Sequence, residues 1–84
     1  MGRKEKLIQR LCRRPKDFTW GELETLLKAL GYRESTKGRT GGSRRRFLHK
    51  DAAAIFLHKP HPGNILKRYA INEVIRVLKE EGLI

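Results

Sequence analysis

Residues 41–49 combine side chains suited to holding a phosphate chain. Two glycines precede the Ser43 hydroxyl, three consecutive arginines follow it, and Phe47 and His49 complete the segment. Arginine binds phosphate oxygens through paired N–H donors, and glycine lets the main chain approach a ligand closely. We therefore expect this segment to contact a polyanion, with a simple hairpin turn as the alternative interpretation of the two glycines.

The charge of the whole chain also favours a polyanionic partner. The 84 residues include 20 Lys and Arg against 9 Asp and Glu, a formal net charge of +11. Residues 33–50 contain seven basic side chains against Glu34, and residues 1–17 contain seven more against Glu5 and Asp17. Such one-sided charge favours nucleic acid over a membrane surface.

Histidines supply the groups that could move a proton near neutral pH. They are His49, at the end of the arginine-rich segment, and His58 and His61, which flank a Lys-Pro pair. Together with Cys12 they could form a zinc site, but His-x-x-His across a proline is poor ligand spacing, so we expect no metal or cofactor. The single cysteine excludes an internal disulfide and is typical of a reducing cytoplasm.

Apolar periodicity predicts three helices. Residues 4–14 form a short amphipathic helix that Pro15 ends, with a solvated basic face or, alternatively, an RNA or partner contact. A stripe of leucines predicts a second helix from residue 19 to residue 31. A last helix spans residues 68–81, with its apolar side chains directed to the core.

The second helix has the clearest boundary signals. Thr19 and Glu22 have the spacing of a capping box, in which each side chain bonds the other residue's backbone N–H. Phe18 and Leu23 match a hydrophobic staple, and Gly31 supplies a left-handed end. We expect this helix to be purely structural.

Between the last two helices the periodicity changes to that of strands. Strands are predicted at residues 32–36, 43–49 and 54–58, close enough in sequence to pair as antiparallel hairpins. The order is α-α-β-β-β-α, which predicts an α+β fold with a three-stranded antiparallel sheet and helices on one of its faces.

Strand alternation separates the arginines of the central strand. Arg44 and Arg46 share one face, whereas Arg45 and Phe47 share the other, where Phe47 enters the core. A simple hairpin register places Arg44 opposite His58, at the end of the sheet away from His49.

Several of these segments together resemble the HicA toxin family. The resemblance rests on the second helix, on the Gly42-Ser43 start of a basic strand with Phe47 and His49, on the proline-histidine segment and on residues 74–83. It covers about residues 18–84 and leaves residues 1–16 as a basic helical extension. HicA toxins are small RNA-cleaving proteins of bacterial and archaeal toxin–antitoxin pairs.

The resemblance implies a fold similar to the double-stranded-RNA-binding domain, cleavage of mRNA, and neutralisation by an acidic HicB-type antitoxin. The family commonly has a catalytic histidine directly after Gly-Ser, but this chain has Arg44 there. His49 matches a second family histidine on the same strand, and His61 matches one in the loop after the third strand. The catalytic role therefore does not transfer to position 44.

Cleavage of RNA without a metal needs a base, an acid and cations that stabilise the charged transition state. Histidine suits the first two roles, so His61, His58 and His49 are the candidate catalytic residues. The expected RNA-binding residues are Ser43, Arg44, Arg46, Lys59, Lys67 and Arg68.

Two other interpretations stay open. The chain could be a non-catalytic RNA-binding module of the same fold, which Arg44 favours, or its basic surface could be an interaction face for an acidic protein.

A single domain over residues 1–84 is expected. We expect it in the cytoplasm, because the sequence contains neither a signal-peptide pattern nor an apolar run of about 18 residues.

Overall fold

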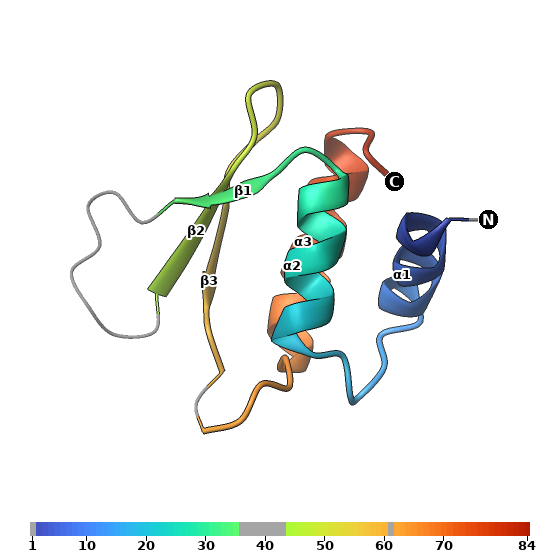
Figure 1. The fold of residues 1–84 in the computed structure, drawn as a ribbon, viewed down its shortest axis with the longest axis vertical. Helices are drawn as coiled ribbons and strands as arrows, with labels where there is room; N and C mark the ends of the chain where they lie inside the picture. The colour runs from blue at the N-terminus through green and yellow to red at the C-terminus, as the bar shows by residue number, and fades with distance from the viewer. Residues whose placement is uncertain (1, 36–43, 61) are drawn as a thin grey trace.

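The computed structural model describes residues 2–35, 44–60 and 62–84 (Figure 1). Over these residues it contains three helices and one antiparallel sheet with the strand order β1-β2-β3. The elements are α1 (Arg3–Cys12), α2 (Trp20–Ala29), β1 (Arg33–Ser35), β2 (Arg44–Leu48), β3 (Ile55–His58) and α3 (Arg68–Glu80).

The predicted α+β fold is confirmed. α2 and α3 cover one face of the sheet, and α1 packs against these helices on the side away from the strands (Figure 1). Leu7 and Leu11 of α1 are buried in the same apolar cluster as the leucines of α2 and the apolar face of α3. The helical extension is thus part of the core.

Several element boundaries differ by one or two residues from those that the periodicity predicts. α1 stops at Cys12 rather than at residue 14, because Arg14 has a φ of +52° and the residue before a proline disfavours helix. β3 begins at Ile55 rather than at residue 54, and α3 ends at Glu80 rather than at residue 81. Thr36 and Ser43, the predicted ends of two strands, lie outside the described residues.

The predicted capping box at the start of α2 is confirmed. The Thr19 hydroxyl oxygen accepts from the Glu22 N–H at 3.1 Å, and the Glu22 carboxylate accepts from the Thr19 N–H at 2.9 Å. Arg10 of α1 donates to the same carboxylate at 2.8 Å. The Arg10 guanidinium and, more weakly, the Thr19 N–H hold the pKa of Glu22 below its usual value, against the opposing effect of partial burial.

The end of α2 depends on Gly31 and His49. Gly31 has a φ of +101°, and the following Tyr32 N–H returns to the Leu27 carbonyl at 2.8 Å, as in a Schellman motif. The Asp51 N–H donates to His49 Nδ1 at 2.9 Å, so Nε2 carries the proton that it shares with the Leu30 carbonyl, 3.0 Å away. The imidazole thereby holds the end of α2 against the turn after β2.

We predict that Gly31→Ala destabilises the fold more than Gly82→Ala. Both glycines have positive φ, but a Cβ at Gly31 would lie 2.7 Å from His49 Nε2, whereas a Cβ at Gly82 meets nothing within 4 Å. Backbone strain alone should cost about 1–2 kcal/mol at Gly82, and crowding should raise the loss at Gly31 to about 2–4 kcal/mol. Urea unfolding measures the free energy of unfolding of both variants. Equal losses would show that the His49 imidazole moves aside without loss of stability.

We also predict that Glu22→Gln lowers the melting temperature at pH 7 and much less at pH 3. The pKa of Glu22 is lowered on folding, so its contribution to stability is present above the unfolded pKa of about 4.3 and is lost as pH falls through the folded value. Thermal unfolding followed by circular dichroism at both pH values measures the effect.

Glu24→Gln, on the same helix, is the control for this comparison. An equal loss of melting temperature in the control, or a loss in Glu22→Gln that does not change with pH, would contradict the role given to the Arg10–Glu22 ion pair.

Candidate nucleic-acid interface

The strand register places two arginines, a phenylalanine and a histidine together on the outer face of the sheet. Arg44 lies directly opposite His58, and Arg46 lies directly opposite Phe56. Directly opposed residues share a face, with Cβ atoms about 4.5–5.5 Å apart. We call Arg44, Arg46, Phe56 and His58 the outer array; its face points away from α2 and α3.

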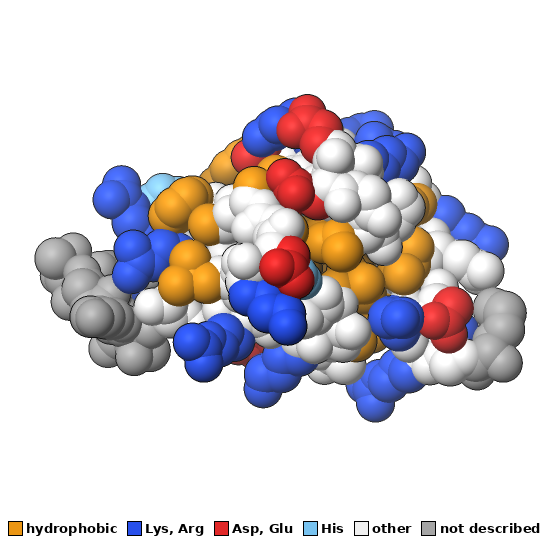
Figure 2. Space-filling model, turned by 90° about the horizontal axis from the view of Figure 1, so that it is seen from above, with side chains coloured by type: hydrophobic (Ala, Val, Ile, Leu, Met, Phe, Trp, Pro, Cys, Tyr) orange, Lys and Arg blue, Asp and Glu red, His pale blue; other side chains and the backbone are white. Residues whose placement is uncertain are grey.

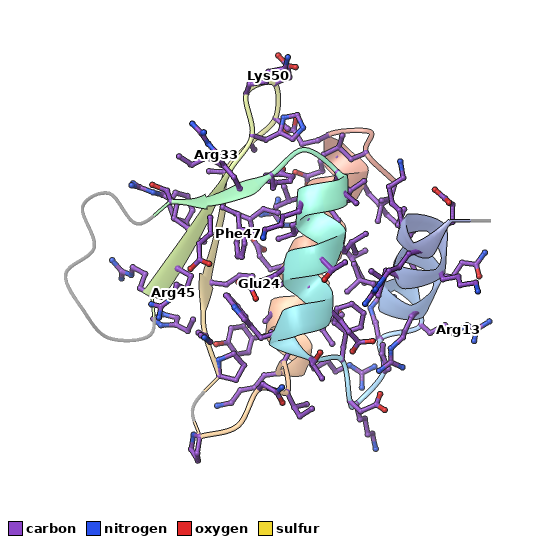
Figure 3. The ribbon with its side chains drawn as sticks, in the orientation of Figure 1. Arg13, Glu24, Arg33, Arg45, Phe47 and Lys50 are labelled. Atoms are coloured by element: carbon purple, nitrogen blue, oxygen red, sulfur yellow. The ribbon has the colours of Figure 1, made fainter. Side chains whose placement is uncertain are left out.

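The inner face of the sheet takes the remaining arginine of the run. Arg45 lies opposite the buried Leu57 and forms an ion pair with Glu34, 3.1 Å away, that leaves its side chain only 18% exposed. Phe47 is buried, directed from β2 toward α2 (Figure 3), with its ring centroid 5.6 Å from that of Trp20. The predicted separation of Arg44 and Arg46 from Arg45 and Phe47 is confirmed, and Trp20 is a buried packing residue.

A pocket of about 370 Å³ adjoins the outer array at the His58 end. Its lining residues come from the end of β3, the proline-containing loop and the start of α3. These three segments lie at the bottom of the molecule in Figure 1. Its described lining residues are His58, Lys59, Pro60, Pro62, Ile65, Lys67, Tyr69 and Ala70. Lysine ammonium groups, an imidazole and a phenol make this lining suitable for a phosphate and an attached ring.

The start of α3 adds to the attraction for anions. Lys67 is the N-cap residue, its side chain makes no capping hydrogen bond, and Arg68 opens the helix. Helix N-termini present backbone N–H groups and partial positive charge to anions. The arrangement thus concentrates positive potential beside the pocket.

Main-chain hydrogen bonds to the start of α2 hold the segment that leads into α3. The Trp20 N–H donates to the Asn64 carbonyl at 2.7 Å, and the Leu66 N–H donates to the Phe18 carbonyl at 2.9 Å. Ile65 and Thr19 form an isolated antiparallel bridge. The capped helix therefore sets the position of one pocket wall.

The predicted site residues are only partly brought together. Arg44, Arg46, His58, Lys59 and Lys67 line the outer array or the pocket, and Arg68 lies next to them at the start of α3. Ser43 and His61 lie outside the described residues.

His49 lies toward the opposite end of the sheet from His58. In the β2–β3 register Phe47 pairs with Ile55, whereas Arg44 pairs with His58. Both ring nitrogens of His49 form hydrogen bonds with the main chain. The His49 ring packs edge-on to the Tyr32 ring, with 4.9 Å between the ring centroids. The register therefore keeps His49 away from the pocket, as the predicted hairpin implies.

The sequence interpretation missed Tyr69 and Phe56. Both side chains are exposed, by 60% and 61% respectively. The alternation of residues 55–58 in the sequence already directs Phe56 away from the core. The sequence therefore could have indicated an exposed aromatic side chain on the same face of the sheet as arginines. Tyr69 joins the pocket only through the packing of α3 on the sheet.

Basic side chains are not confined to this end of the molecule. Figure 2 shows Lys and Arg around most of the outline of the face seen from above, with fewer Asp and Glu between them. Within the described residues, no group of three or more His, Cys, Asp and Glu is placed to hold a metal ion. Among the described helices none is long and apolar enough to cross a membrane.

Comparison with known proteins gives one match. A family model described as the HicA toxin of bacterial toxin–antitoxin systems matches residues 20–83, which include α2, the sheet and α3 and leave out α1. No curated protein and no solved structure matches the chain.

Proposed function

Because the chain belongs to the HicA toxin family of bacterial toxin–antitoxin systems, we propose that it is an endoribonuclease that cleaves mRNA without a metal ion. The observation that carries the proposal is the placement of Arg44 opposite His58, beside a pocket lined by lysines. These groups supply what RNA cleavage needs, namely a proton carrier next to cations that bind phosphate.

In the proposed reaction a base removes the proton from a ribose 2′-hydroxyl, and its oxygen attacks the adjacent phosphorus. The O2′–P bond forms, the P–O5′ bond breaks, and an acid returns a proton to the departing O5′. The products carry a 2′,3′-cyclic phosphate and a 5′-hydroxyl. His58 is the proton carrier of the outer array, and His61, three residues later, is proposed as the second.

The arginines replace part of what the usual family histidine would provide. Arg44 occupies that position in the sequence, and its guanidinium remains charged throughout the reaction, so it stabilises negative charge on phosphorus but transfers no proton. His49 would have to break two main-chain hydrogen bonds to take part. We therefore assign the proton transfers to His58 and His61, and a structural role to His49.

The partner that restrains this activity is proposed to be an acidic antitoxin of the HicB type, acting in the cytoplasm. A chain with a formal charge of +11 attracts an acidic protein and RNA to the same basic surface. An antitoxin seated over the outer array and pocket would exclude RNA directly.

We predict that His61→Ala and His58→Ala each abolish growth inhibition when the protein is expressed. Loss of a general acid or base should reduce cleavage of labelled RNA about 10²–10⁴-fold. The rates are measured with and without EDTA, with Arg13→Gln on α1 as the control that keeps activity. Undiminished toxicity of either variant would reject the catalytic role given to that histidine, and cleavage abolished by EDTA would reject the metal-free mechanism.

The same assay tests the non-catalytic alternative that Arg44 favours. RNA binding without cleavage by the purified protein would support the binding module over the enzyme. Binding no stronger than that of a charge-matched unrelated protein would instead support a surface that serves an acidic partner.

A second prediction concerns the salt dependence of RNA binding. Arg44→Gln with Arg46→Gln should weaken binding and reduce the slope of log K against log salt by about 1.4 for single-stranded RNA, if each arginine neutralises one phosphate. Arg13→Gln with Lys16→Gln removes the same charge from the α1 side of the molecule and should change the slope less. A larger change in this control would place the interface on α1.

A further inference from the structure

The outer array contains an exposed aromatic ring that phosphate binding does not require. The Phe56 side chain is 61% exposed, whereas the neighbouring strand residues Ile55 and Leu57 are buried. Exposing a phenylalanine to water forfeits the free energy that its burial would contribute. Its surroundings therefore have to indicate what the ring contacts.

Those surroundings are cationic. Arg46 lies directly across from Phe56, and on its other side Arg46 lies across from Ser35, whose hydroxyl it contacts at 3.4 Å. Arg44 and His58 form the next opposed pair on this face, two residues along the strands and about 6.6–6.8 Å away. Arg33, on the same face at β1, projects away from the helices into solvent (Figure 3).

From this geometry we infer that Phe56 is a stacking platform for an unpaired base, and that the RNA recognised by this site is single-stranded. The inference rests on the proposed function and deepens it. One base lies on the Phe56 ring, its phosphates lie along Arg46 and Arg44, and the next nucleotide passes His58 into the pocket. There the exposed ring of Tyr69 offers a second aromatic surface.

The physical reason is the accessibility of the bases. In an A-form duplex the bases are stacked on one another, and proteins read mainly its shape, phosphates and 2′-hydroxyls. A sheet face with an aromatic residue beside arginines instead fits splayed bases with backbone phosphates beside them. The duplex recognition typical of the double-stranded-RNA-binding fold would make no use of Phe56.

The experiment uses 12-nucleotide 2′-O-methyl oligouridine, which lacks the attacking hydroxyl and is not cleaved, and a 12-base-pair 2′-O-methyl duplex. Fluorescence anisotropy gives the affinities of the full-length protein over a range of salt. We expect the single strand to bind more tightly than the duplex. Phe56→Leu should weaken single-strand binding about 5- to 100-fold with the salt slope unchanged, because stacking releases no counterions.

Two controls separate stacking from other roles of Phe56. Phe56→Trp keeps an aromatic face and should restore single-strand affinity. An oligonucleotide with abasic positions should lose affinity for the wild-type protein but bind Phe56→Leu with little additional loss, the non-additivity expected when both changes remove one contact. Because the side chain is exposed, the variants should melt close to the wild type.

The outcomes distinguish this inference from the proposed function. Wild-type protein that binds neither RNA would overturn both. Equal binding of strand and duplex with no effect of Phe56→Leu would overturn the stacking role and leave the proposed nuclease standing. An effect of Phe56→Leu only on binding of an acidic antitoxin, or only on self-association, would likewise overturn it.

Discussion

Burial of Phe47 against Trp20 is the contact on which the arrangement of the charged site depends. Side chains alternate along a strand, so a one-residue slip of β2 would move Phe47 into solvent and carry Arg44 and Arg46 into the core. The ring is 2% exposed and lies 5.6 Å from the indole of α2. The free energy of burying this aromatic pair therefore also determines which arginines remain on the outer face.

Several carboxylates of the described residues are placed where they stabilise the fold. Glu22 caps α2 and binds Arg10, Glu34 binds Arg45 on the inner face, and Glu73 and Glu80 bind Arg76 along α3. The pairs at Glu22 and Glu34 neutralise arginines that join packed elements of the scaffold. Basic side chains elsewhere cover much of the surface seen in Figure 2, where they add to the attraction for an anion.

Local signals made much of the architecture predictable. The capping box at Thr19 and Glu22, the left-handed end at Gly31 and the alternation of β2 each involve neighbours within a few residues. Even the opposition of Arg44 and His58 follows from the hairpin, because the strands are close in sequence. The ends of α1, β3 and α3 were less predictable, since single-residue φ values and strand pairing decide where regular hydrogen bonding stops.

The sequence by itself determined the order of the elements, the excess of positive charge and the face on which each strand residue lies, because these depend on local periodicity and hairpin pairing. Only the tertiary structure decided that the loop before α3 is held to Phe18 and Trp20, and that Tyr69 and Lys59 line the same pocket. It also decided that both ring nitrogens of His49 form hydrogen bonds with the main chain, at Leu30 and at Asp51. These contacts join segments far apart along the chain or depend on the precise course of a turn, and such geometry becomes defined only when the apolar faces pack.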